Sequence, residues 1–328
     1  MTIAGVIFHS RRLLSKVLWD LGLFSLLYSP KVAQGVIMYH GVDECSFKKY
    51  NLRFCSSKDL YRQLLYFKKT YNILPLEDLF DNNQKKSSKF KLALTFDDGY
   101  ENWYSLVFPI IKKLKIPVTF FISRPKGVNY LWLDIVDIYI SACVNPIKID
   151  QFYFQKSVNK YIDNKKNVNL KSWLEEQTNL SNFHKVKALF EIELGCDYES
   201  FDPTYWRLLS EEQIKELANS DLVEIGSHCI SHLPLTNLNT NQIGEELFES
   251  KHILESITGK PIKSIAYPIG MYNSEILDVA EKIGYQHQLA VNYKLQSDFS
   301  DKRVLSRIGV YSDYSVEEQV RHFINDMK

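Results

Sequence analysis

The chain has 328 residues and carries 40 Lys and Arg against 39 Asp and Glu, which gives a formal net charge of +1. This balance excludes a strongly basic nucleic-acid-binding protein, because such proteins bind phosphates through a surplus of Lys and Arg. The hydrophobic share of 45% is too high for a disordered chain and is sufficient for a large buried core. We therefore expect a globular protein of one large domain or two ordinary ones.

Residues 1–34 are predicted to form a helical segment ahead of the main domain. Apolar residues follow Arg11 and Arg12 at helical spacing, and Asp20 leaves an apolar run too short to span a bilayer. A helix packed on the domain and a helix on a membrane surface both remain open. Because no signal-peptide cleavage site follows, we expect a cytoplasmic protein or one peripheral to the cytoplasmic membrane.

The five cysteines are irregularly spaced, and no C-x-x-C pair occurs among them. They are Cys45, Cys55, Cys143, Cys196 and Cys229. An odd number at such spacing predicts reduced thiols instead of a disulfide framework or a zinc ribbon.

Seven short β-rich runs alternate with helix-like segments along the rest of the chain. The predicted strands are 36–39, 92–96, 118–122, 222–225, 264–267, 288–291 and 307–310, and helical patterns cover 57–70, 104–114, 210–219, 240–258 and 274–283. Ser57 and Ser210 are predicted to be helix N-caps, and Ser210 with Gln213 fits a capping box. This alternation predicts a parallel α/β sheet, either open or closed into a barrel.

Residues 129–206 interrupt this alternation between the third and fourth predicted strands. The stretch is helix-rich and polar in patches, so it is predicted to be a helical insertion in one domain spanning 35–328. A lid over a substrate site and plain surface structure are both compatible with it.

Unusual polar residues fall at the carboxyl ends of four predicted strands. His40 follows the first run, and Asp97 with Asp98 follows the second. His228 and Pro268 follow two later runs. Because parallel strands build their active sites at the rim formed by these ends, the residues are expected to lie close together.

The acidic pair and the histidine pair each have a structural and a functional interpretation. Adjacent carboxylates at Asp97 and Asp98 point in different directions, so one can bind a metal and the other can act as a base. In isolation such a pair is more typical of a solvated turn. His228 and His232, four residues apart, can share a metal if the segment is tightly turned, although surface histidines would show the same spacing. On one rim, the two pairs predict a site of two histidines and one carboxylate with open coordination positions.

These motifs resemble those of the polysaccharide deacetylases, the NodB-homology group of carbohydrate esterase family 4. Thr95–Tyr100 matches the T-F-D-D-G motif, and His228–His232 matches the H-[ST]-x-x-H motif in the same order. Tyr267–Gly270 is similar to the third, Pro-containing motif. Segments 38–40 and 306–310 look like flanking signatures of a bacterial branch that includes enzymes acting on N-acetylglucosamine polymers.

The resemblance implies a distorted (β/α) barrel, often of seven strands, which agrees with the seven predicted strands. It also implies that Asp98, His228 and His232 ligate a divalent metal, with zinc expected first and Co, Ni or Mn as alternatives. Asp97 would be the general base that activates water, and the backbone N–H of Ile269 would donate to the oxyanion.

The chain departs from the family pattern at several positions. Cys229 stands where the family has Ser or Thr, which places a soft sulfur close to the metal ligands. Ala266 stands where many members have an Arg that orients the base, and Arg307 is the candidate substitute. The Leu-x-His motif of the general acid is not evident, so His40 becomes the candidate acid, and Tyr267 is a candidate for substrate contact.

The leading functional hypothesis is therefore a metal-dependent hydrolase that removes N-acetyl groups from an amino-sugar polysaccharide or glycan precursor. A non-catalytic, carbohydrate-binding relative of the same fold is the alternative, although such a protein has no physical reason to retain both ligands and base. A phosphate-handling enzyme with Asp97 as nucleophile is a third reading, but no Gly-rich phosphate loop accompanies it.

Overall fold

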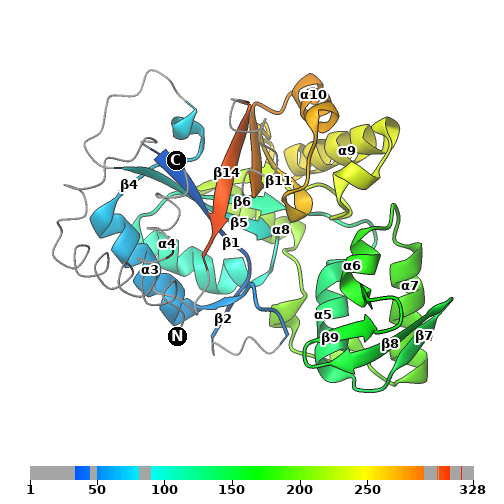
Figure 1. The fold of residues 1–328 in the computed structure, drawn as a ribbon. Helices are drawn as coiled ribbons and strands as arrows, with labels where there is room; N and C mark the ends of the chain where they lie inside the picture. Colours follow the sequence, from blue (N-terminus) through cyan, green and yellow to red (C-terminus); the bar gives the residue numbers. More distant parts are fainter. Residues whose placement is uncertain are drawn as a thin grey trace, which may run out of the picture.

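The computed structural model describes residues 34–44, 50–80, 90–291, 301, 303–310 and 319 (Figure 1). The predicted N-terminal helical segment lies outside the described residues, apart from Gln34 at its end. None of the described helices is long and apolar enough to cross a membrane.

Seven parallel strands close into a ring, as the sequence predicts. They are β1 (Gln34–Tyr39), β5 (Lys91–Asp98), β6 (Val118–Ile122), β11 (Val223–Ser227), β12 (Ser264–Ala266), β13 (His287–Val291) and β14 (Val304–Gly309). Neighbours pair in this order, and β1 also pairs with β14, which closes the barrel. A short strand, β4 (Asn72–Ile73), pairs with the start of β5, while β2 (Val42–Asp43) and β3 (Cys55–Ser56) form a separate parallel pair. The predicted distorted (β/α) barrel is confirmed.

The helices cover the outside of the barrel and begin close to their predicted positions (Figure 1). They are α3 (Ser57–Thr70), η2 (Trp103–Val107), α4 (Phe108–Leu114), α8 (Glu211–Ala218), α9 (Thr240–Thr258) and α10 (Ser274–Ile283), with short turns at η1 (Glu77–Leu79) and η6 (Leu235–Asn237). The predicted capping box of Ser210 and Gln213 is confirmed. The predicted cap at Ser57 is wrong by one residue, because extended Ser56 accepts the backbone N–H of Asp59.

Side chains fill the interior of the barrel. Five of them come from five different strands and form one cluster: Val36, Ala93, Phe121, Ala266 and Leu289. Phe121 fits there because the facing residue is Gly226, at which a Cβ atom would lie 2.4 Å from the Phe121 ring. The barrel is therefore a packed core, and chemistry is confined to its rim.

The insertion follows β6 and forms a lobe beside the barrel (Figure 1). Its elements are α5 (Trp132–Ala142), β7 (Ile147–Ile149), β8 (Phe152–Ser157), β9 (Lys160–Asp163), β10 (Val168–Asn169), α6 (Leu170–Glu175), α7 (Ser181–Ala188), η3 (Leu189–Glu193), η4 (Tyr198–Ser200) and η5 (Pro203–Tyr205). The four strands make an antiparallel sheet, which the prediction of a helical insertion did not include.

The reason for this omission lies in a polar stretch of the insertion. Residues 163–167 form the turn between β9 and β10, where Asp163 accepts the backbone N–H groups of Lys165 and Lys166. Phe154 on β8 and Tyr161 on β9 are fully buried and pack into a hydrophobic core that belongs to the lobe. The strands are short and half-polar, so their pattern is weak, and the insertion is a small α+β unit.

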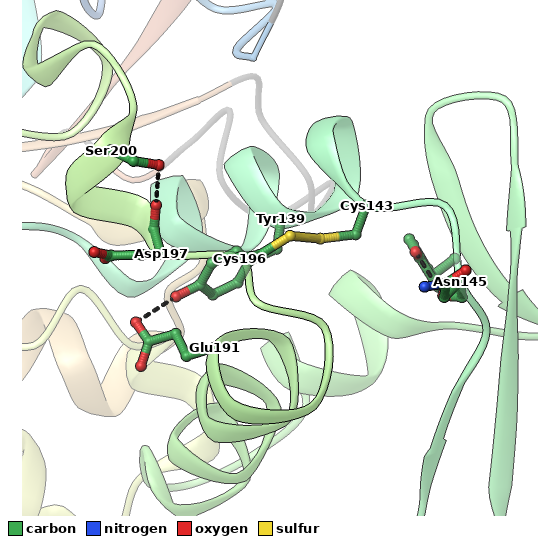
Figure 2. Close-up of a disulfide and its surroundings, with 8 residues drawn as sticks. Tyr139, Cys143, Asn145, Glu191, Cys196, Asp197 and Ser200 are labelled. Carbon is green, nitrogen blue, oxygen red and sulfur yellow. Dashed lines mark hydrogen bonds between the residues drawn. A yellow bond between two sulfur atoms is a disulfide. The ribbon is translucent and has the colours of Figure 1, made fainter.

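A disulfide joins the end of α5 to the segment after η3 (Figure 2). It links Cys143 to Cys196, 53 positions apart, while Cys229 is a buried, free cysteine. The prediction of reduced thiols is therefore wrong for this pair. The predicted cytoplasmic or membrane-peripheral location stays a prediction, and structural disulfides are rare in a reducing cytoplasm.

Replacing both Cys143 and Cys196 with Ser is expected to lower the free energy of unfolding of the insertion by about 2–4 kcal/mol. The cause is that the bond no longer restricts the intervening loop in the unfolded chain. Urea denaturation followed by fluorescence of Trp132 and Trp173 measures the change. Dithiothreitol should lower the stability of the unmodified protein toward that of the double variant. Equal numbers of alkylated thiols before and after reduction would contradict the presence of the bond.

Candidate active site

The polar residues predicted at the strand ends meet at one rim of the barrel. Asp97 and Asp98 are the last two residues of β5, and His228 directly follows β11. His40 directly follows β1, and Pro268 lies two residues beyond the end of β12. The closed parallel ring places all these ends on the same side, as the sequence analysis predicts.

Asp98, His228 and His232 form a compact, buried cluster. One ligand atom from each residue lies within 4.8 Å of the others. The Asp98 Oδ1 atom is 3.5 Å from His228 Nε2 and 3.1 Å from His232 Nε2. Among the described residues this Oδ1 atom is buried without a hydrogen-bond partner, so its lone pairs remain available for a cation.

The protonation states of this cluster also suit a metal. His228 Nδ1 lies 2.7 Å from the carbonyl oxygen of Ala266, which can only accept, so Nδ1 donates a hydrogen bond there and Nε2 is the nitrogen that faces the cluster. Burial lowers the pKa of His232 and favours its neutral, ligating form, although Asp98 opposes the shift. Burial would raise the pKa of Asp98, but Arg53 and the two histidines outweigh it and hold that pKa well below its ordinary value. One carboxylate and two imidazoles are a donor set that fits a divalent metal such as zinc.

The backbone around this cluster is held in an uncommon conformation. Asp98, Cys229, His232 and Ile269 all have positive φ, at 98°, 63°, 57° and 57°. Non-glycine residues rarely adopt this conformation, and it costs free energy that surrounding contacts must supply. Such strain gathered in one place is typical of a functional site.

Several contacts that the sequence analysis missed hold residues 228–232, the histidine loop, in place. Ser123, just beyond β6, donates its hydroxyl to the carbonyl oxygen of His228 at 2.7 Å. Glu246 on α9 accepts the backbone N–H groups of Ile230 and Ser231. Trp132 at the start of α5 donates its indole N–H to the carbonyl oxygen of His232. Of these, only Ser123 had a readable signal, since it follows a predicted strand at the active rim.

Arg307 pairs with Asp97 inside the barrel. Its two Nη atoms donate to the two carboxylate oxygens of Asp97, each at 2.6 Å. Both side chains are almost completely buried, so a surface ion pair is excluded. Burial would raise the pKa of Asp97, but Arg307 and His228 outweigh it and lower that pKa below its ordinary value. The structure thus places Arg307 of β14, the candidate substitute for the family's Arg, against Asp97, the carboxylate that it was predicted to orient.

His40 lies close to the site, in the electrostatic field of Asp97, Asp98, Arg53 and His228. Burial lowers its pKa to about 4, although the two carboxylates oppose the shift. The imidazole is therefore neutral at pH 7 and carries no surplus proton. This condition does not favour its predicted role as a general acid in the resting enzyme, and that role stays a prediction.

The two candidate residues of the third motif, Ile269 and Tyr267, differ in burial and in their distance from the rim. Ile269 is half-buried in a left-handed conformation within η7 (Pro268–Gly270), beside the rim. Its predicted donation to the oxyanion stays a prediction. Tyr267 is completely buried and donates its hydroxyl to Gln288, whose amide in turn donates to the carbonyl oxygen of Leu277 on α10, so the Tyr267 side chain lies between the barrel wall and that helix. A direct contact between its side chain and substrate is not favoured by this position.

Cys229 does not join the metal-ligating cluster. Cys229 lies between His228 and His232 in the sequence, and its side chain is completely buried. Burial, together with the negative charge of Glu246, raises the pKa of the thiol. The cluster of ligand atoms found among the described residues consists of Asp98, His228 and His232. We therefore expect a protonated thiol that packs behind the loop and does not bind the metal.

A cavity of about 460 Å³ lies between the insertion and the barrel, next to the histidine loop. Tyr130, Phe183 and His184 line it from the insertion, and Ile230 and Ser231 line it from the loop. The insertion thus borders space that adjoins the site.

Comparison with known proteins supports the same assignment. The profile of the polysaccharide deacetylases matches residues 84–287, which include both metal-ligand motifs. This chain belongs to the polysaccharide deacetylase family. The predicted resemblance to its NodB-homology branch is thereby confirmed.

The relatives of this family member extend the comparison to sequence and fold. YxkH of Bacillus subtilis (strain 168), which bears the name of a polysaccharide deacetylase, is 42% identical over 78 residues. These residues are 24% of this chain, and the chain spans 28% of the length of YxkH. The Streptococcus pyogenes deacetylase PplD, solved in complex with acetate, has a TM-score of 0.55 at 20% identity, covering 88% of this chain and 96% of PplD. IcaB from Ammonifex degensii has a TM-score of 0.54 at 19% identity, covering 89% of this chain and 96% of IcaB. At these identities the likeness to the two structures concerns the fold.

Proposed function

We propose that this protein is a metal-dependent hydrolase that removes N-acetyl groups from an amino-sugar polysaccharide or glycan precursor and releases acetate. The observation that carries the proposal is the juxtaposition of two buried units at one rim. One unit is the cluster of Asp98, His228 and His232, and the other is the Asp97–Arg307 pair. Membership of the polysaccharide deacetylase family and the acetate complex of PplD support it.

The two units divide the chemistry between them. A divalent metal held by Asp98, His228 and His232 would act as a Lewis acid and make water a competent nucleophile near neutral pH. Asp97 remains ionised because Arg307 lowers its pKa, so it is ready to accept a proton from the attacking water. The Ile269 backbone N–H is proposed, on the family resemblance, to donate to the developing oxyanion.

Breakdown of the amide requires one proton on the departing amine. Once Asp97 has taken a proton from water, its low pKa makes it a strong acid that can deliver the same proton to that amine. His40 is neutral at pH 7, so it can relay a proton between water, carboxylate and amine but does not supply an extra one. The balance is one amide and one water consumed, with one acetate ion and one protonated amine formed.

The finer parts of the proposal concern the metal, the substrate and the surroundings. Zinc fits best because one carboxylate and two imidazoles leave open positions, with Co, Ni or Mn as substitutes. The cavity beside the histidine loop offers room for a neighbouring sugar unit. We also retain the proposal that the N-terminal segment contacts a membrane surface, which would suit a lipid-linked substrate.

The test is acetate release from a panel of N-acetylated glycans and nucleotide sugars, after metal removal by chelation and reconstitution with Zn²⁺. Activity should be lost with the metal and restored with it. His228→Ala is expected to abolish both acetate release and Zn²⁺ binding, because it removes one ligand. His252→Ala, which removes a histidine on α9 outside the site, is the matched control and should leave both unchanged.

Two outcomes would contradict the proposed deacetylase activity. If sugars bind but no member of the panel releases acetate above the level of His228→Ala, the protein is a carbohydrate-binding relative of the deacetylase fold. If phosphate is released instead of acetate, Asp97 acts as a nucleophile and the deacetylase assignment fails.

A further inference from the structure

Arg53 lies beside the metal-ligating carboxylate, although no motif marks this position. Its Nη1 atom donates to Asp98 Oδ2 at 3.1 Å, and its Nη2 atom donates to Asp134 Oδ1 at 2.9 Å. One guanidinium therefore bridges a carboxylate at the end of β5 and a carboxylate on α5 of the insertion.

Three neighbours hold this guanidinium in place. Asn51 accepts both the backbone N–H and the Nε–H of Arg53, at 3.0 Å and 3.1 Å. Asp134 in turn accepts hydrogen bonds from Asn51 at 3.0 Å and from the Tyr100 hydroxyl at 2.8 Å. Asp134 and Tyr100 are almost completely buried. Such a network leaves the Arg53 side chain little freedom, so its orientation is set before any ligand arrives.

The two oxygens of Asp98 then have different environments. Oδ2 accepts from Arg53, whereas Oδ1 faces His228 Nε2 and His232 Nε2. A hydrogen bond to one oxygen of a ligating carboxylate fixes which oxygen meets the metal and at what angle. Arg53 holds Asp98 in the rotamer in which the partnerless oxygen points to the two imidazoles.

We propose that Arg53, clamped by Asn51, Tyr100 and Asp134, is a positioning residue that orients Asp98 toward the metal. Through Asp134, helix α5 of the insertion is then a structural support of the metal centre. The inference rests on the proposed metal-dependent function. It also predicts the direction in which metal affinity changes when Arg53 is removed. The Arg53 cation lies close enough to the site to repel a metal, so its charge alone would weaken metal binding. Removal of Arg53 therefore weakens metal binding only if orientation outweighs repulsion.

The experiment is a titration of the metal-free protein with Co²⁺, whose visible absorption reports both affinity and ligand geometry. Arg53→Met should weaken Co²⁺ binding about 10- to 100-fold, the range typical of lost outer partners of metal ligands. It should also alter the absorption bands and lower kcat at saturating metal, with KM little changed. Arg53→Lys should be intermediate, since an ammonium cannot bridge both carboxylates as a planar fork does. Tyr100→Phe, which removes a single hydroxyl, gives a milder variant if Arg53→Met fails to fold.

The matched control is Arg303→Met. Arg303 also bridges carboxylates, those of Asp278, Glu281 and Asp301, but it directly precedes β14, at the opposite end of the barrel. Its loss should leave Co²⁺ affinity and spectrum unchanged. Equal or tighter Co²⁺ binding by Arg53→Met would overturn the proposal, and a raised KM with normal metal affinity would instead assign Arg53 to substrate. Because metal binding is measured without substrate, a protein that binds Co²⁺ but releases no acetate defeats the proposed function and leaves this inference standing.

Discussion

Asp97→Asn is expected to lower kcat for acetate release by about 10²- to 10⁴-fold, the contribution typical of a general base. The amide keeps the shape of the carboxylate but cannot take a proton from water. Metal affinity should persist, because the ligating atoms belong to Asp98, His228 and His232. Acetate release at saturating Zn²⁺ and a direct Zn²⁺ titration of the same preparation measure the two quantities.

The variant leaves the Arg307 charge buried without its ionic partner, so some loss of stability accompanies it. Thermal denaturation of the metal-loaded variant shows whether it is folded under assay conditions. Full activity in a variant that binds metal would remove Asp97 from the role of base.

Arg307→Met is expected to have the second largest effect, through the pKa of Asp97. Arg307 is the main influence that lowers this pKa against the opposing effect of burial. Without it the pKa rises, so Asp97 becomes protonated at a higher pH and loses its function as base there. The acidic limb of the kcat/KM profile should therefore move to higher pH, and a full pH–rate profile at constant saturating metal measures the shift.

The same substitution also tests stability. Removing one partner of a buried ion pair typically costs about 3–5 kcal/mol, because the remaining charge is uncompensated. The double variant Asp97→Asn with Arg307→Met should recover part of that loss in urea denaturation. An acidic limb that stays in place, together with an unchanged urea midpoint, would show that Arg307 does not act on Asp97.

Much of the barrel and the metal-ligand set could be predicted from the sequence. Parallel strands buried on both faces leave short, continuous apolar runs, and the residues after them fall on one rim. This reasoning brings the acidic pair and the two histidines together, and the family resemblance then implies that Asp98, not Asp97, is the metal ligand. Arg307 required a further step, since its pairing with Asp97 joins residues 210 positions apart and leaves no local pattern.

What could not be predicted depends on contacts between side chains that are distant in sequence. The Arg53–Asp134 contact joins residues 81 positions apart through a guanidinium that no spacing rule marks. The pairing of Cys143 with Cys196 cannot be deduced from five irregular cysteines. The sheet of the insertion was missed because its half-polar strands gave no clear periodicity of two.

The closed ring of strands has a consequence for how the protein is made. β1 pairs with β5 and with β14, and the register of the second pair joins Ile37 to Ile308. Arg307 lies on β14, so during synthesis Asp97 can pair with it only after nearly the whole barrel has left the ribosome. Contacts of such long range form slowly and late. Closure of the barrel and formation of the Asp97–Arg307 pair therefore occur together, and a barrel that lacks β14 would have neither a closed core nor a partner for Asp97.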